Sequence, residues 1–413
     1  MTRLPSSLRS LSLPEKSKHG MGVHWKRNLL LVLVATAVLS SAVGAGVVLF
    51  LERRRAAEWE VLLEAAETVD QRFVGQFDRD EALESSIDGL VSGLGDRWSY
   101  YLSADEVSDY ENAMQNRFVG IGVTVTKAEN AGMHIEEVYR DSGAEDAGLV
   151  PGDEIYAADG VNLLPLTLEE AKAFVVGEEG TSVLLSILHE NGQLEKISVE
   201  RRSVFLDPVS AKMIGSVGYV VIENFDDGAA QSFCKSVDEL LEAGAKALLF
   251  DVRFNGGGYV REMTQMLDYL LPEGVIFIHG DAEGHNDVTT SDAAHVDIPM
   301  AVLVNSDSYS AAEYFAALLQ TMGVPVIGEH TVGKGYSQQA IYLSDGSALI
   351  LSTKKYYLPD GSSLAGIGIA PDYIVELAGD QRTLLYYDQL SVEEDLQLQT
   401  ALQVLSDIHL NGG

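Results

Sequence analysis

The sequence predicts an α/β protein with a layered domain of alternating strands and helices in its C-terminal half. After Arg202, short apolar runs alternate with amphipathic stretches of helical length, and several of the runs lead into glycine clusters. Before that point, residues 118–202 contain short strand-like runs separated by glycine turns, with two helical stretches. A smaller, strand-rich unit is therefore expected ahead of the layered domain.

The elements of the layered domain follow one another in a regular order. Strands are expected at Val217–Ile222, Ala247–Val252, Val275–His279, Met300–Val304, Val324–Ile327, Ala340–Leu343 and Ala348–Ser352. Helices are expected at Gly228–Ala243, Val260–Leu271 and Ser310–Met322. The tail from Thr383 onward is acidic and also has a helical pattern.

The composition excludes several classes of function. The 413 residues include 62 acidic and 28 basic side chains, and the resulting formal charge of −34 repels the phosphate backbone of nucleic acids. The single cysteine, Cys234, allows no internal disulfide and no cysteine-rich metal site, and we expect it to be a buried structural thiol. The histidines form no H-E-x-x-H motif. We therefore expect no metal, no cofactor and no nucleic-acid partner.

Residues Leu29–Leu51 form an uncharged, apolar run of 23 residues, long enough to cross the hydrocarbon core of a membrane as a helix. Basic residues precede it, which favours an N-terminus inside the cell and a translocated remainder. We therefore expect a single-pass protein of the cell membrane whose main part is extracytoplasmic. A cleaved signal peptide is the alternative. Its apolar core is normally about 7–15 residues, but small residues such as Ala42 and Ala45 keep cleavage open.

The pattern of residues 56–114 predicts polar helices, because apolar positions recur at helical spacing and Ser103 and Glu106 form a capping box. This pattern fits two interpretations. The region is either a helical arm through which two copies of the chain form a homodimer, or a simple spacer.

Three segments of the layered domain carry the residue types that nucleophilic catalysis needs. The first, Asp251–Gly258, follows an apolar strand and ends in three glycines. Glycines let the backbone approach a second molecule and present N–H groups in an open turn, so Gly257 and Gly258 are candidates for an oxyanion hole. The alternative is a tight turn with no chemical role.

The second segment, Val304–Glu313, places Ser310 where a strand ends and a helix begins. A serine there lies beside free backbone N–H groups, such as that of Ala311, and at the positive end of the helix dipole. Ser310 is therefore a candidate nucleophile and Ala311 a third candidate for the oxyanion hole. The alternative is structural, because Ser310 and Glu313 also match a capping box.

The third segment, Gly328–Gln338, contains Lys334 between two glycines, in a sequence typical of no regular element. Lys334 can turn inward, with Gln338 holding its amine by a hydrogen bond. The alternatives are a solvated loop lysine, a phosphate-binding loop, and a catalytic triad that uses His330. The phosphate-binding loop would need Ser or Thr where Gly335 stands, and a helix afterwards where the pattern predicts a strand.

A lysine must be neutral before it can accept a proton, and its unperturbed pKa is about 10.4. Burial disfavours the charged form and is the available means of lowering this pKa. We expect the apolar strands Val324–Ile327 and Ala340–Leu343, which bracket the lysine loop, to supply the dry surroundings.

Together the three segments resemble the carboxyl-terminal processing peptidases, a family of serine peptidases with a Ser/Lys dyad and a crotonase-like α/β core. The family pattern is approximately D-L-R-N-N-P-G-G, G-S-A-S-A-S-E and G-x-x-T-x-G-K-G-x-x-Q, which corresponds to Asp251–Gly258, Asp307–Glu313 and Gly328–Gln338. The resemblance implies that Ser310 is the nucleophile, Lys334 the general base and Gln338 its positioning partner. The sequence departs from the pattern, without losing a catalytic group, at Phe254, Gly256, Asp307, Tyr309 and Ala312. Tyr309, beside the nucleophile, is expected to narrow the pocket.

Residues Phe118–Arg202 resemble a PDZ domain, which this family carries ahead of its catalytic core. The stretch Ala147–Ile155 is the most specific part of that match, and Trp98–Ser103 resembles the family's lead-in segment. The resemblance implies that a peptide adds a strand to the domain, with its C-terminal carboxylate bound by the loop of Gly120, Ile121, Gly122 and Val123.

The expected domain order is a cytoplasmic tail at 1–28, a transmembrane helix at 29–51, a helical N-terminal region at 52–114, a PDZ domain at 115–202, a peptidase core at 203–376 and a C-terminal helical tail at 377–413. The predicted function is that of a membrane-anchored serine endopeptidase that cuts proteins near their C-termini, with the PDZ domain recognising free C-terminal tails. The alternative is a catalytically inactive scaffold whose PDZ domain tethers such tails.

Overall fold

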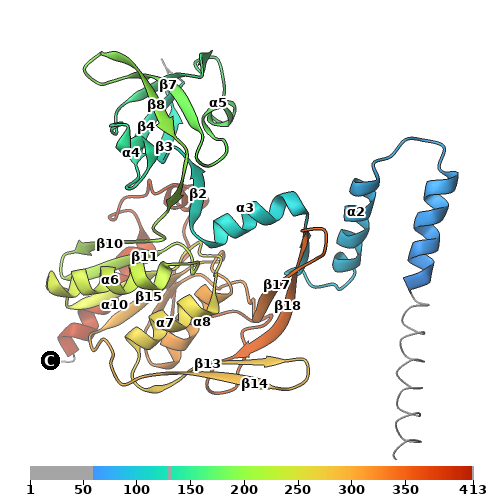
Figure 1. Ribbon diagram of the computed structural model, residues 1–413. Helices are drawn as coiled ribbons and strands as arrows, with labels where there is room; N and C mark the ends of the chain where they lie inside the picture. The colour runs from blue at the N-terminus through green and yellow to red at the C-terminus, as the bar shows by residue number, and fades with distance from the viewer. Residues whose placement is uncertain (1–58, 129–131, 412–413) are drawn as a thin grey trace, which may run out of the picture. The chain divides into compact units, whose positions relative to one another are not determined.

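The computed structural model of the protein describes residues 59–128 and 132–411, and the chain divides into two compact units, Met1–Ala82 and Leu83–Gly413 (Figure 1). The predicted transmembrane segment Leu29–Leu51 lies outside the described residues. Within the described ranges, no helix is both long enough and apolar enough to cross a membrane. In the first unit residues 59–72 are helical, and α2 (Arg79–Ser92) begins near its end.

A strand-rich subdomain occupies the first part of the second unit. Its elements are β2 (Arg117–Gly120), β3 (Val123–Lys127), β4 (Met133–Val138), α4 (Gly143–Asp146), β5 (Glu154–Ala158), β6 (Val161–Asn162), α5 (Leu168–Val175), β7 (Ser182–Leu188), β8 (Leu194–Glu200) and β9 (Arg202–Phe205). The main sheet has the order β3-β4-β5-β7-β8, with β6 paired to β5, while β2 pairs with β9. Alternate residues of β7 point inward, and a separate core forms around Val183, Leu185 and Ile187.

A larger six-stranded sheet forms the rest of the unit. Its strands and the helices around it are β10 (Val209–Ile214), β11 (Val217–Ile222), α6 (Ala229–Glu242), β12 (Ala247–Asp251), α7 (Val260–Leu270), β15 (Met300–Val304), α8 (Ala311–Thr321), β16 (Val326–Gly328), β19 (Tyr373–Ile374), α9 (Gly379–Tyr386) and α10 (Leu396–Asn411). The strand order is β10-β11-β12-β15-β16-β19, and all neighbours are parallel except β10 and β11. Strands β12 and β15 are buried along their whole length, as expected for parallel strands that are covered on both faces.

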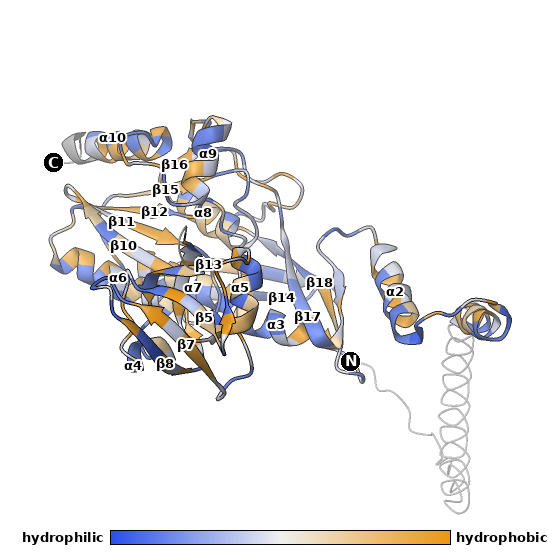
Figure 2. Cartoon of the chain, turned by 90° about the horizontal axis from the view of Figure 1, so that it is seen from above, coloured by the Kyte–Doolittle hydropathy of each residue, from blue (hydrophilic) through white to orange (hydrophobic). Residues whose placement is uncertain are grey.

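Helices cover both faces of this sheet and make three layers. Helices α6, α7 and α8 pack on one face, in a core that includes Phe233, Phe250 and Phe315. Helix α10 packs on the other face through Leu398, Ala401 and Leu405. Figure 2 shows the hydrophobic strands of the sheet between α10 and α6. The segment 377–413, expected as a tail, thus contributes one of the three layers.

A second, antiparallel sheet lies next to the lysine loop. It consists of β1 (Tyr100–Leu102), β13 (Gly274–Asp281), β14 (Asn286–Ser291), β17 (Tyr336–Tyr342) and β18 (Ala348–Tyr357). The order is β1-β18-β13-β14, with β17 paired to β18. Strand β1 precedes α3 (Ala104–Met114) and belongs to the predicted helical N-terminal region. A segment from before the strand-rich subdomain is therefore built into the sheet that carries the lysine loop.

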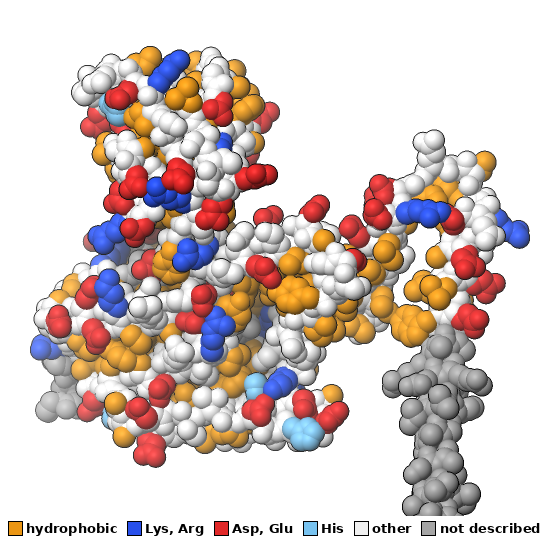
Figure 3. Space-filling model, in the orientation of Figure 1, with side chains coloured by type: hydrophobic (Ala, Val, Ile, Leu, Met, Phe, Trp, Pro, Cys, Tyr) orange, Lys and Arg blue, Asp and Glu red, His pale blue; other side chains and the backbone are white. Residues whose placement is uncertain are grey.

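The predicted strands and helices of the layered domain are confirmed, with ends that shift by a few residues. Between residues 206 and 376, sequence reasoning missed β10, β14 and β19. Strand β14 is exposed at five of six residues and β19 at both of its two, so neither has the apolar pattern of a buried strand. The strand-like run over residues 119–125 forms two strands, because β2 ends at Gly120 and β3 begins at Val123. Acidic side chains are spread over the face shown in Figure 3.

Candidate active site

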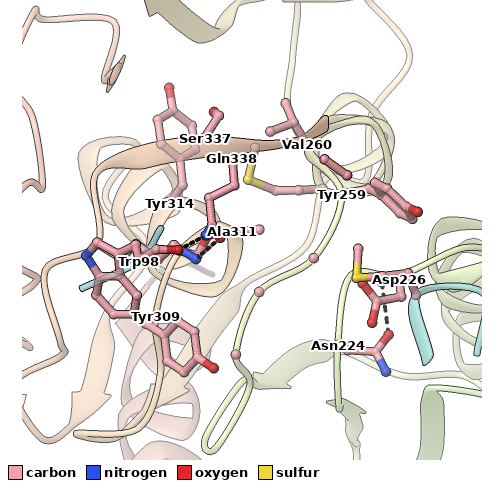
Figure 4. A pocket seen from close by; sticks show the side chains of 18 of the residues that line it. Trp98, Asn224, Asp226, Tyr259, Val260, Tyr309, Ala311, Tyr314, Ser337 and Gln338 are labelled. Carbon is pink, nitrogen blue, oxygen red and sulfur yellow. Dashed lines mark hydrogen bonds between the residues drawn. The ribbon is translucent and has the colours of Figure 1, made fainter. Parts of the chain in front are cut away.

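One cavity of about 720 Å³ brings the three predicted segments together. All of the predicted catalytic and oxyanion-hole residues line it, namely Ser310, Lys334, Gln338, Gly257, Gly258 and Ala311. Residues that precede the strand-rich subdomain in the chain also line the cavity, namely Trp98, Tyr100, Tyr110, Glu111 and Met114. Figure 4 shows Trp98, Tyr309 and Gln338 on one side of the cavity and Asn224 and Asp226 on the other.

Ser310 occupies a sharp turn between β15 and α8. It immediately precedes the helix, and its backbone has φ 61° and ψ −123°. A positive φ is strained for a residue other than glycine, at a cost on the order of 1–3 kcal/mol, and such strain concentrates at functional sites. A strained strand-to-helix turn is also what exposes the nucleophilic serine in α/β-hydrolases. The local geometry of Ser310 therefore suits a nucleophile.

Lys334 lies in the irregular loop between β16 and β17 and is turned inward, with 7 % of the residue exposed. Its Nζ donates a hydrogen bond of 2.5 Å to Oε1 of Gln338. Burial lowers the pKa of the Lys334 amine from 10.5 to about 8, against the opposing charges of Asp96 and Glu313. Because Gln338 is neutral, it holds the amine without adding a charge that would raise the pKa.

Two aromatic rings lie close to the Lys334 amine. Nζ lies 4.8 Å from the ring centroid of Trp98 and 5.7 Å from that of Tyr309. The two rings stack, with centroids 5.6 Å apart and planes 27° from parallel. Four of the seven residues of β17 are exposed, but Ala340 lines the same cavity as Lys334, so a contribution of the flanking strands to the dry surroundings stays a prediction.

Glu313, on the first turn of α8, is fully buried and binds both halves of the predicted dyad. Its Oε1 accepts hydrogen bonds from Thr331 Oγ1 at 2.5 Å and from the Gly333 N–H at 2.6 Å. Its Oε2 accepts from the Lys334 N–H at 2.8 Å and from the Ser310 N–H at 3.1 Å. One carboxylate therefore ties the backbone of the serine to the backbone of the lysine loop.

The glycine loop packs directly against the serine. A Cβ on Gly257 would lie 2.9 Å from the Ala311 nitrogen and 3.1 Å from Ser310 Oγ, so a larger residue does not fit there. The Gly257 N–H donates to Oδ1 of Asn255 at 2.8 Å, so it reaches an oxyanion only if this bond is broken. Ala311 begins α8, and a helix leaves the N–H groups of its first turn unpaired.

Residues 216–375 match peptidase family S41, and residues 134–188 match the PDZ domain. The carboxy-terminal processing protease CtpB of Bacillus subtilis is 31 % identical over 324 residues, which cover 76 % of this chain and 66 % of that protein. This chain belongs to peptidase family S41. It is a serine-type peptidase of the carboxyl-terminal processing group.

Two further comparisons agree with the family. The carboxyl-terminal-processing protease of Synechocystis is 29 % identical over 335 residues, or 79 % of this chain and 77 % of that protein. A solved structure from Bacteroides fragilis, described as an S41 protease, has a TM-score of 0.53 at 18 % identity, over 81 % of this chain and 93 % of that chain. At this identity the second likeness supports the fold alone.

The predicted carboxylate loop Gly120–Val123 precedes the matched PDZ span of this S41 peptidase. Strand β3, which follows the loop, is at the edge of its sheet, where a peptide can add as a further strand. Ile121 is buried, and its carbonyl accepts a hydrogen bond from the Ala144 N–H at 2.8 Å. Gly122 has φ 85°, and a Cβ there would lie 2.2 Å from Cβ of Ser142, so the turn requires glycine.

The alternatives to a lysine base gain no support. His330 does not line the cavity, and its Nδ1 lies 3.1 Å from the carbonyl of Thr331. The lysine loop leads into β17, whereas a phosphate-binding loop leads into a helix. No group of His, Cys, Asp or Glu within the described residues could hold a metal ion. Cys234 packs against the core on α6, and partial burial raises its pKa to about 11.

Sequence reasoning missed three residues of the site. The sequence marks Glu313 only as a capping residue, through its spacing from Ser310. The Trp98 carbonyl accepts a hydrogen bond from Nε2 of Gln338, and only the lead-in resemblance drew attention to this segment. The buried Tyr356 hydroxyl donates to the Lys334 carbonyl and interacts with the side chain of Ser310. No local pattern marks Tyr356, because its partners come from other parts of the chain.

Proposed function

We propose that this S41 peptidase is a membrane-anchored endopeptidase that cleaves proteins near their C-termini, with Ser310 as nucleophile and Lys334 as general base. One observation carries the proposal. The lysine amine is buried against a neutral acceptor, Gln338, in the same cavity as a serine on a strained turn. A lysine that served only as a positive charge would gain more from a carboxylate partner or from water.

The proposed reaction has two halves. The neutral Lys334 amine takes the hydroxyl proton of Ser310 as the oxygen attacks the substrate carbonyl, and the ammonium then gives that proton to the leaving amine. A water molecule next attacks the acyl ester, Lys334 accepts its proton, and that proton returns to the Ser310 oxygen as the new carboxyl product leaves. The N–H groups of Gly258 and Ala311 stabilise the oxyanion in both halves, and Gly257 joins them only if its present bond is broken.

The test of this proposal is cleavage of an unstructured protein with an apolar C-terminal tail by the full-length protein in detergent. Ser310→Ala should abolish cleavage while the circular dichroism spectrum and Tm stay at wild-type values, because only the attacking hydroxyl is lost. Ser306→Ala is a matched control, since it removes a hydroxyl from the same loop outside the cavity. Near-wild-type cleavage by Ser310→Ala would overturn the proposal and favour an inactive scaffold.

We infer that the PDZ domain, proposed to span residues 115–202, binds the free C-terminal tail of the substrate at the loop Gly120–Val123. The edge position of β3 and the glycine turn at its start support this role. Calorimetry should show that amidation of a peptide's C-terminus weakens its binding, because the loop N–H groups then lose a charged acceptor. Equal affinity for the acid and the amide would leave the domain with a structural role only.

Membrane attachment through Leu29–Leu51 and a homodimer complete the proposal. The 23-residue uncharged run supports the first, and exposed apolar side chains on helix 59–72, including Trp59, Leu62 and Leu63, support the second. In cells the protein should sediment with membranes and be cut by protease added outside. In detergent, sedimentation velocity should give twice the mass of one chain. Full protection in spheroplasts would contradict the topology, and a monomer would contradict the dimer.

A further inference from the structure

The side chain of Gln338 is held at both of its ends. Its Oε1 accepts the hydrogen bond from Lys334 Nζ, and its Nε2 donates to the backbone carbonyl of Trp98. A carbonyl can only accept, so the bond to Trp98 requires the amide nitrogen on that side and turns the amide oxygen toward the lysine. The orientation of the acceptor that serves the Lys334 amine therefore depends on the Trp98 carbonyl.

A carboxylate holds the loop that carries this carbonyl. Oδ2 of Asp96 accepts a hydrogen bond from Ser99 Oγ at 2.6 Å, and Oδ1 accepts from the Trp98 N–H at 3.2 Å. Ser99 Oγ in turn accepts from the Ser352 N–H on β18 at 3.1 Å. The loop between α2 and β1 is thus closed by Asp96 and attached to the sheet beside the lysine loop.

Asp96 also acts on Lys334 through its charge. Burial raises the pKa of the Asp96 carboxyl, but hydrogen bonds from Ser99, Ser352 and the Trp98 N–H, with a smaller effect of the Lys334 charge, bring it below 3.8. The carboxylate opposes the lowering of the Lys334 pKa that burial causes. The other titratable groups that face Lys334 in the described part of the chain are Glu313 of α8, Tyr309 before α8 and Tyr356 of β18. The guanidinium of Arg97 lies 4.2 Å from the Trp98 ring centroid.

We propose that Asp96 is a positioning residue of the active site: it holds the Trp98 carbonyl, which orients Gln338 and thereby the Lys334 amine. The inference rests on the proposed role of Lys334 as general base. It assigns a required part of the site to a segment about 120 residues ahead of the S41 match, which begins at residue 216. A peptidase core without this segment would carry the serine and the lysine but would lack the support of the base.

Two variants separate the position of the base from its charge. Asp96→Ala removes both acceptors and should lower kcat roughly 10- to 100-fold with little change in KM, because displacement of a reacting group by about 1 Å costs on that order. Asp96→Asn keeps an acceptor for the Trp98 N–H but removes the charge. Its kcat should fall less, and the acid limb of its kcat/KM profile should move to lower pH, because no carboxylate at position 96 then favours the ammonium.

Asp345→Ala is the matched control. Asp345 closes a turn of the same kind between β17 and β18, where its Oδ1 accepts from the Ser347 N–H at 3.0 Å and from Ser347 Oγ at 2.6 Å. This variant should keep the wild-type kcat and pH profile. If Asp96→Ala does not fold, the fall in kcat of Asp96→Asn decides the question, because its pH shift reports only the lost charge.

Failure of this inference can be told apart from failure of the proposed function. Wild-type kcat in the Asp96→Ala variant, or in Asp96→Asn if the former does not fold, together with an inactive Lys334→Ala, would overturn the positioning role alone. A fully active Lys334→Ala would overturn the assignment of the base, and with it the premise of this inference.

Discussion

Lys334 and Asp226 line the same cavity, and burial pushes both toward their neutral forms, yet their surroundings differ. Burial lowers the pKa of Lys334 to about 8, while burial and the nearby charge of Glu262 raise the pKa of Asp226 to about 7. The Lys334 amine has Gln338 as a partner. Within the described residues, the buried Oδ1 of Asp226 has no hydrogen-bond partner and faces the backbone at Gly258.

The difference teaches that burial alone does not give a group the contacts expected of the proposed base, Lys334. Burial selects the neutral form of both groups, because a low-dielectric environment penalises any charge. Only Lys334 also has its amine held by a fixed acceptor and its backbone tied to that of Ser310 through Glu313. Burial disfavours the charged form of Asp226 as well, but its carboxyl lacks comparable contacts among the described residues.

The largest expected effect tests the side of the cavity that holds Lys334. Lys334→Arg should lose roughly 10²–10⁴-fold in kcat, as Lys334→Ala does, because a guanidinium stays protonated and cannot accept the serine proton. Steady-state cleavage assays measure this loss. Lys212→Arg, on the exposed part of β10, should have no effect. Substantial activity in Lys334→Arg would show that the lysine supplies positive charge and that another group is the base.

A smaller loss is expected when the anchor of the dyad is weakened. Glu313→Gln keeps the shape of the side chain but replaces one accepting oxygen with an NH₂ group, which cannot accept the hydrogen bonds donated to it. We therefore expect kcat to fall roughly 10- to 100-fold. Glu106→Gln makes the same change in the exposed capping box of α3 and should leave kcat unchanged. Thermal unfolding should show that both variants are folded, so that the difference in kcat reports on the site and not on loss of structure. Equal kcat in the two variants would remove Glu313 from the site.

The pH dependence should follow Lys334 and not Asp226. Since the base must be neutral, kcat/KM should rise with pH through about 8, the pKa of Lys334. The neutral fraction of such a group goes from about one tenth at pH 7 to about nine tenths at pH 9, a rise of roughly ninefold. Asp226→Asn should leave this limb in place. Loss or displacement of the limb in that variant would show that the carboxyl, and not the amine, controls the rate.

The smallest expected effect concerns the stability cost of Asp226. Its pKa is raised to about 7, so the folded state loses stability relative to the unfolded state as pH rises from near 3.8 through about 7. Asp226→Asn should therefore stabilise the protein by about 1–2 kcal/mol at pH 8, after allowance for partial exposure, and by less at pH 5. Denaturant unfolding at both pH values measures this. Asp227→Asn, which removes an exposed carboxylate paired with Arg261, serves as the control. The same gain at pH 5 and pH 8 would contradict the assigned cause.

Local pattern was enough to predict the layered domain and to single out Ser310 and Lys334. Strands β11 and β15 were predicted with their observed ends, because buried parallel strands are continuous apolar runs between turns. The serine turn and the glycine-flanked lysine are likewise short segments, and residue type and spacing alone are enough to recognise them. Exposed strands such as β14 escaped prediction, because an exposed strand has no hydrophobic periodicity to detect.

By itself, the sequence determined the order of the elements, the resemblance to the family, and the residues proposed for the nucleophile and the base, because these depend on short-range pattern. Only the tertiary structure decided what surrounds them. The bond between Gln338 and Trp98 joins residues 240 positions apart, and α10 returns to cover a sheet that begins with β10. Desolvation and hydrogen-bond geometry depend on which distant groups pack together. No local pattern could therefore place Trp98 and Tyr309 beside the Lys334 amine.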